Sequence, residues 1–176
     1  MQKLAFEALQ EMRVKARWEA LDKESIQIAY AKACGKIYHA PTFENGDSRK
    51  QLLARSIYLL YKKESLWTES QRIRAGILFR EYPDLKKAYY LSMRLGLIYH
   101  QCKHKDTALT RLARWYDEVE KSGFLAFGRV IRSIQTHYLE IVNFFDRRST
   151  NAASESFNAK IKDFRTQFRG VKDRTF

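Results

Sequence analysis

The chain has 176 residues and carries 33 Lys and Arg against 20 Asp and Glu, which gives a formal net charge of +13. Large apolar side chains are too frequent for a disordered polar tail, since 14% of the residues are aromatic. Only nine residues are Gly or Pro, which argues against an all-β sandwich or barrel with its many turns. No Gly-rich phosphate loop is present, so a doubly wound nucleotide-binding fold is excluded as well. We expect a mainly α, basic chain of about one domain's length.

Cysteine usage and hydropathy indicate an intracellular protein. Cys34 and Cys102 lie far apart and belong to no CxxC motif or histidine cluster, which is typical of reduced thiols. No stretch approaches the roughly 18–20 apolar residues of a membrane span, and residues 1–18 lack the apolar core of a signal peptide. We therefore expect a cytoplasmic protein without a membrane or small-molecule partner.

The positive charge is densest near the C-terminus. Residues 147–176 hold eight bases and three acids, a net charge of +5, whereas the other 146 residues carry +8. A basic surface can simply keep a chain in solution, but Lys and Arg also displace the counterions condensed on a phosphate backbone. The charge density over 147–176 favours a polyanion partner for that segment, with solubility as the alternative.

Helical periodicity begins at the N-terminus. Apolar residues recur every fourth position from Leu4 to Ala16 and predict a first long helix. Leu9 and Trp18 are expected to widen its apolar stripe. Gly35 and then Pro41 end this helix, and residues 41–48 read as a loop.

Two further helices are expected before residue 83. The first runs from about Arg49 to Lys63, with buried leucines at four positions: Leu52, Leu53, Leu59 and Leu60. The second begins at Thr68, because Thr68 and Gln71 form a capping-box pattern in which each side chain can bond the other residue's backbone. It continues through Ile73, Ile77 and Leu78 to Tyr82.

Three more helices are expected after Pro83, which suits a first helical turn because it lacks a backbone donor. Asp106 or Thr107 caps the next helix and Gly123 ends it. A further helix is expected over 124–138, and the apolar run 141–145 reads equally as a buried strand or as helix. The expected inner residues of the three helices are Leu85, Tyr89, Leu95, Ile98, Leu109, Leu112, Tyr116, Val119, Phe127, Ile131, Ile134 and Tyr138.

Two groups of residues have both a structural and a functional interpretation. His100 and His104 have the four-residue spacing of metal ligands on a helix, but the neighbouring lysines and the lack of further ligands favour ordinary surface histidines. The three tryptophans are interpreted as core anchors, with stacking on bases as the alternative. They are Trp18, Trp67 and Trp115.

The C-terminal segment carries the strongest chemical signal. Ser149, Thr150 and Asn151 can each cap a helix that continues to about Phe168. At 100° per residue, one face of this helix is apolar and the other is polar. The polar face holds Glu155, Asn158, Lys162, Arg165 and Arg169. This is either a solvated charged face or a site in which Glu155, with other acids, ligates Mg²⁺ while the bases hold phosphates.

The run NFFDRRSTNAASESFNAKIKDFRTQFRGVKD, residues 143–173, resembles the C-terminal motif of bacterial insertion-sequence transposases with an Asp-Asp-Glu (DDE) active site. In that family the pattern TNA-x-x-E-x-x-N-x-x-I-K, followed by Arg and an Arg-Gly pair, carries the last acid. Residues 2–20 and 43–71 resemble the region that follows the family's second aspartate. The matching C-terminal positions are Thr150, Asn151, Ala152, Glu155, Asn158, Ile161, Lys162, Arg165, Arg169 and Gly170.

The resemblance implies a ribonuclease-H-like catalytic core interrupted by a helical insertion. Residues 1–140 would be the insertion region, and residues 141–176 would be the C-terminal edge of the core with its last acid. Glu155 would be a catalytic, Mg²⁺-binding carboxylate. The remaining residues of the polar face would contact DNA, and these are Asn158, Lys162, Arg165 and Arg169.

The family's second aspartate lies just upstream of a Gln-Lys-Leu segment like residues 2–4. We therefore expect this chain to be a transposase fragment without the two catalytic aspartates, inactive alone. The alternatives are a stand-alone helical nucleic-acid-binding or regulatory protein without catalysis, and an inert remnant of a mobile element. The oligomeric state, including a homo-oligomer, stays open.

Overall fold

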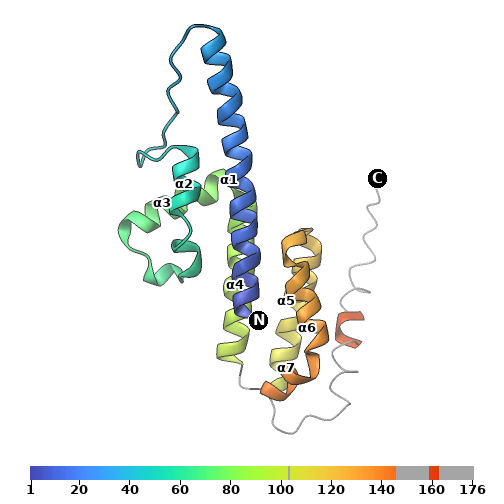
Figure 1. Ribbon diagram of the computed structural model, residues 1–176. Helices are drawn as coiled ribbons and strands as arrows, with labels where there is room; N and C mark the ends of the chain where they lie inside the picture. The colour runs from blue at the N-terminus through green and yellow to red at the C-terminus, as the bar shows by residue number, and fades with distance from the viewer. Residues whose placement is uncertain (103, 146–158, 163–176) are drawn as a thin grey trace. The chain divides into compact units, whose positions relative to one another are not determined.

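A computed structural model describes residues 1–102, 104–145 and 159–162, and within these ranges every regular element is a helix (Figure 1). The single β pairing in the described ranges is an isolated bridge between Thr42 and Ser48. The mainly α class is thus confirmed. The expected edge of a ribonuclease-H-like core falls mostly outside the described residues and stays a prediction.

Packing divides the chain into two compact units. One comprises Phe6–Tyr90, here called the N-terminal unit, and the other comprises Met1–Ala5 together with the described residues from Leu91 onward, here called the C-terminal unit. Two helices, α1 (Gln2–Ala33) and α4 (Pro83–Gln101), contribute to both. The division at residue 140 that the resemblance implies is not tested by this packing.

In the N-terminal unit, α1 buries one face of its first half. Ala8, Leu9 and Ala20 are buried, whereas none of the residues 21–33 is. The prediction for Trp18 is wrong, since its side chain is 63% exposed. Nine residues at 100° each place Trp18 on the side of α1 opposite Leu9, so the two cannot share a stripe.

The helix predicted over 49–63 is much shorter in the structure. Helix α2 spans Arg49–Arg55, and 3₁₀ turns follow at η1 (Leu59–Tyr61) and η2 (Glu64–Leu66). Side chains from later in the chain hold the backbone of these turns. The indole N–H of Trp67 donates to the Leu59 carbonyl at 2.8 Å, and the Tyr89 hydroxyl donates to the Lys62 carbonyl at 2.8 Å. The four predicted leucines are nevertheless buried.

Helix α3 (Glu69–Glu81) begins as predicted. The Thr68 hydroxyl accepts from the Gln71 backbone N–H at 3.3 Å, and the Gln71 side chain accepts from the Thr68 backbone N–H at 3.2 Å. Pro83 then opens α4, also as predicted. Ile73, expected on the inner face of α3, is 48% exposed, whereas Ile77 and Leu78 are buried.

The C-terminal unit is built from the second half of α4 and the helices that follow it. These are α5 (Lys105–Ser122), η3 (Leu125–Phe127), α6 (Gly128–Thr136) and α7 (Tyr138–Phe145). Trp115 on α5 is fully buried, as predicted, and its indole N–H donates to the Leu91 carbonyl of α4 at 2.8 Å. Phe127 packs near this ring, with 6.5 Å between centroids.

Three boundaries in this unit correct the sequence prediction. Helix α5 starts after His104, so Asp106 and Thr107 lie inside it, and His100 and His104 are not on one helix. The predicted helix over 124–138 is divided into η3 and α6, and ends at His137. The run 141–145, left open between strand and helix, is helical in α7.

The C-terminus of α5 depends on one residue with positive φ. Gly123 follows the helix with φ +68°, a conformation that side chains other than glycine disfavour, and nothing lies within 4 Å of a Cβ added there. Gly128 has equally open surroundings but an ordinary helical φ of −58°. Neither position is crowded, so the two glycines differ in their backbone conformation and not in the space for a side chain.

We expect Gly123→Ala to lower the free energy of unfolding by about 1 kcal/mol through the left-handed backbone alone. Gly128→Ala is the matched control and should leave stability unchanged or raise it by about 0.5 kcal/mol, because alanine loses less backbone entropy on folding. Urea denaturation followed by circular dichroism measures both. Equal effects of the two variants would contradict the assigned αL cap.

Candidate nucleic-acid interface

Most of the residues singled out in the sequence lie outside the described part of the chain. This applies to Glu155, Asn158, Arg165 and Arg169. Lys162 lies in the described segment 159–162, which is helical, and its side chain is exposed. The helix predicted there is confirmed for these four residues, and the gathering of the five site residues on one face stays a prediction.

Asp47 is the only acid that is buried among the described residues, and it forms an ionic cluster in the N-terminal unit. Arg74 donates its Nε–H to Oδ2 at 2.8 Å, and Asn45 donates to the same oxygen at 2.9 Å. Arg55 pairs with Oδ1. Both carboxylate oxygens are therefore occupied, and the cluster ties the loop over 43–48 to α2 and α3.

The electrostatics of Asp47 favour a structural role. Burial opposes ionisation, but the hydrogen bonds from Arg74 and Arg55 outweigh it and hold the pKa of Asp47 below its usual value. A divalent ion at this carboxylate would meet two guanidinium groups. No three His, Cys, Asp or Glu side chains gather into a metal-type group anywhere in the described ranges, so these residues do not fit the Mg²⁺ that the sequence resemblance implies.

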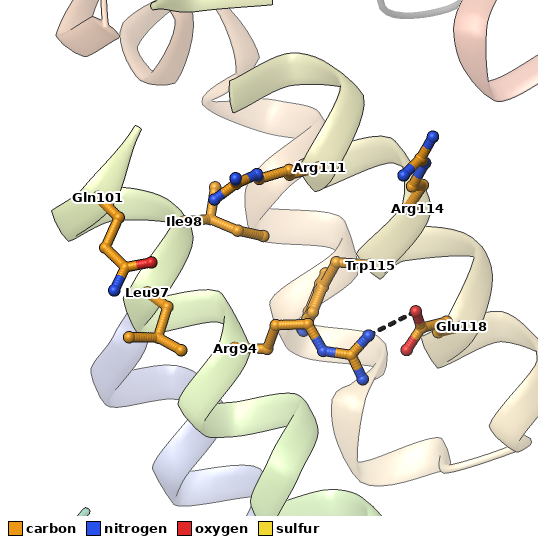
Figure 2. Close-up of a pocket in the computed structure, with 8 residues that line it drawn as sticks. All are labelled: Arg94, Leu97, Ile98, Gln101, Arg111, Arg114, Trp115 and Glu118. Carbon is orange, nitrogen blue, oxygen red and sulfur yellow. Dashed lines mark hydrogen bonds and ion pairs between the residues drawn. The ribbon is translucent and has the colours of Figure 1, made fainter. Parts of the chain in front are cut away.

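A hollow of about 340 Å³ lies between α4 and α5 in the C-terminal unit (Figure 2). Its apolar part is formed by Leu97, Ile98 and the buried Trp115. Its polar part is mostly cationic. The eight lining residues are Arg94, Leu97, Ile98 and Gln101 of α4 and Arg111, Arg114, Trp115 and Glu118 of α5.

A second hollow of about 190 Å³ shares Gln101 and Arg111 with the first. Its other lining residues are Cys102, His104 and Thr107, at the end of α4 and the start of α5. The two hollows therefore follow one seam between the helices, and together they are called the α4–α5 groove below.

The three arginines of the groove differ in their partners. Arg94 reaches from α4 to Glu118 of α5, with 2.5 Å between guanidinium nitrogen and carboxylate oxygen (Figure 2). Arg111 extends from α5 toward Ile98, and Arg114 points away from α4. Within the described ranges, neither Arg111 nor Arg114 makes a hydrogen bond or ion pair, so the groove has two exposed cations available to a ligand.

The family model DDE_Tnp_ISL3, described as a transposase, matches residues 1–176. The chain belongs to this family of insertion-sequence DDE transposases. The resemblance seen in the sequence is therefore confirmed. No curated protein and no solved structure matches the chain. Among the described residues of this transposase chain, no helix is both long enough and apolar enough to cross a membrane.

The sequence prediction missed the groove of the transposase chain. One signal was readable: Arg111 and Arg114 are three residues apart on a helix, and no acid lies three or four residues from Arg111. Arg114, however, has Asp117 and Glu118 three and four residues further on, within reach on the same helix face. Only the structure shows that Arg94, from another helix, takes the Glu118 carboxylate.

The Asp47 cluster gives a testable stability effect. We expect Asp47→Asn to lower the free energy of unfolding by about 2 kcal/mol at pH 7, because it leaves the mostly buried guanidinium of Arg74 and the exposed one of Arg55 without a charged acceptor. Because the folded-state pKa is lowered, this contribution is present above the unfolded pKa and disappears as pH falls through the folded pKa.

Urea denaturation of wild type and variant at pH 7 and near pH 3 measures this effect, and the gap between the two proteins should narrow at the lower pH. Asp22→Asn, which removes an exposed carboxylate from α1, is the control and should change stability little at either pH. A gap for Asp47→Asn that is independent of pH would contradict the ionic role.

Proposed function

We propose that the chain takes part in cutting and joining DNA at the ends of an insertion sequence by Mg²⁺-dependent phosphoryl transfer. The observation that carries the proposal is the family match, which extends over residues 1–176 and so includes the stretch from Thr150 to Gly170. Within that stretch, we assign Glu155 to the position of the family's last active-site acid, on the motif that the sequence resembles. A DNA substrate in turn places the protein in the bacterial cytoplasm, at the nucleoid.

In this proposal Glu155 is the catalytic carboxylate that this chain contributes. Lys162 is seven residues further on, two helical turns away, and so falls on the same side of a continuous helix. The helical conformation of 159–162 and the exposure of Lys162 support that geometry. Asn158, Lys162, Arg165 and Arg169 then contact the phosphates of the DNA strand beside the acid.

The divalent ion needs carboxylates that the described residues do not gather. When bound, such an ion activates the attacking oxygen and stabilises the leaving one. The part assigned to this chain is limited to holding one acid, Glu155, among cations that neutralise the phosphates. The other acids must come from outside the residues that the structure describes.

A second function, DNA binding without chemistry, is favoured by the α4–α5 groove. Arg111 and Arg114 offer charge to a ligand in a unit where no acid cluster is described. The two functions make different predictions for Glu155. In the first, DNA cleavage depends on this residue; in the second, the chain binds DNA and no cleavage depends on it.

We expect Glu155→Gln to lower Mg²⁺-dependent cleavage of an insertion-sequence end at least about a hundredfold, because the amide keeps the shape of the side chain but removes the charge that ligates the ion. The assay incubates the transposase with a labelled insertion-sequence end and Mg²⁺ and measures strand nicking on a gel.

Glu140→Gln on α7 is the matched control, since it removes an exposed carboxylate from a helix of the same chain. It should cleave like wild type. Cleavage by Glu155→Gln at the wild-type rate would overturn the assignment of this residue.

A further inference from the structure

We propose that the α4–α5 groove is a second DNA contact, separate from the Glu155 segment, in which Arg111 and Arg114 hold the phosphate backbone of one strand. This inference rests on the proposed function, because that function makes DNA the ligand of the chain. It adds a binding site within the helical region of the transposase. The residues of its larger hollow, including both arginines, come from α4 and α5.

The charge of the groove points to an anionic ligand. The ion pair between Arg94 and Glu118 neutralises both of its members. Arg111 and Arg114 then leave the first hollow with an uncompensated charge of +2 beside its apolar wall. Because guanidinium groups are planar and offer several donors in a fixed geometry, they suit phosphate oxygens particularly well.

The ion pair also has a positioning role. Glu118 is the only acid that lines the first hollow, and it stands one helical turn after Arg114, where an i,i+4 pair would ordinarily form. Arg94 holds this carboxylate from the other side of the groove. Arg114 is thereby left available to a ligand, and the one negative charge that lines the first hollow is neutralised.

The charge and the course of the groove favour a nucleic-acid strand. A nucleic-acid backbone presents phosphates at regular intervals, which matches exposed arginines that lie one helical turn apart on α5. The hollows follow one another along the seam and share Arg111, which suits a narrow, extended ligand. Exposed Leu97 supplies an apolar contact for a sugar or the edge of a base.

The test measures binding of the 176-residue chain to a fluorescent DNA duplex between 50 and 200 mM NaCl in EDTA, where no metal-dependent chemistry occurs. Each phosphate contact contributes about 0.9 to the slope of log affinity against log salt. The double variant Arg111→Gln/Arg114→Gln should therefore lose about 2 from that slope. Raising the salt from 50 to 200 mM weakens the binding of both proteins. For each arginine removed, the factor by which affinity falls is about threefold smaller than for the wild type.

Two further variants define the site. Arg132→Gln on α6 removes an exposed cation of the same unit that lies outside the groove, so it should keep the wild-type salt slope. Leu97→Glu places a negative charge inside the first hollow and should weaken binding at 50 mM salt even though both arginines remain. Circular dichroism establishes that each variant retains the helical content of the wild type.

The outcomes are distinct from those of the cleavage assay. A groove variant with the wild-type salt slope, or a wild-type chain that does not bind DNA in EDTA, overturns the groove proposal and leaves the role of Glu155 to be decided by cleavage. A smaller salt slope in the groove variants supports the α4–α5 groove as a DNA contact, even if Glu155→Gln cleaves DNA like the wild type. A change in oligomeric mass of the groove variants, measured by light scattering without DNA, would instead identify the groove as a contact between copies of the chain.

Discussion

The C-terminal unit depends on the burial of Trp115 against α4. The indole is fully enclosed and its N–H is satisfied by the Leu91 carbonyl, so the ring joins α5 to α4 through both apolar area and a directional bond. The same ring forms part of the wall of the α4–α5 groove. Trp115 thus sets both the spacing of α4 and α5 and the width of the α4–α5 groove, which is lined by arginines.

Charge pairing distinguishes the two arginine clusters of the transposase chain. Around Asp47 the cations converge on a buried carboxylate and are used to fix a loop. On α5, by contrast, the only acid lining the hollow is bound by Arg94 from the neighbouring helix. The net charge of +13 is therefore used in two ways: Arg55 and Arg74 are both paired with Asp47, whereas Arg111 and Arg114 remain available to a ligand.

Local signals in the sequence identified most helix limits, whereas contacts between distant residues decided the rest. The Thr68–Gln71 cap, the start at Pro83 and the end at Gly123 each follow from the chemistry of one or two neighbouring residues. The short turns that follow α2 were not predictable in this way, because Trp67 and Tyr89 bond to the Leu59 and Lys62 carbonyls from later in the chain. Of the candidate sites, Glu155 came from a sequence motif, while the groove arises from pairing between α4 and α5.

The second half of α1 has a consequence for how the chain unfolds. Residues 21–33 bury no side chain, and their links to the rest of the N-terminal unit are polar, such as Lys50 to Glu24 and Tyr38 to Gln27. A helix of 13 residues is marginal in water by itself, so this stretch persists mainly as a continuation of the packed first half. Its amide protons will exchange through local fraying, while those near Leu9 require the unit to open. One continuous helix therefore contains two levels of stability.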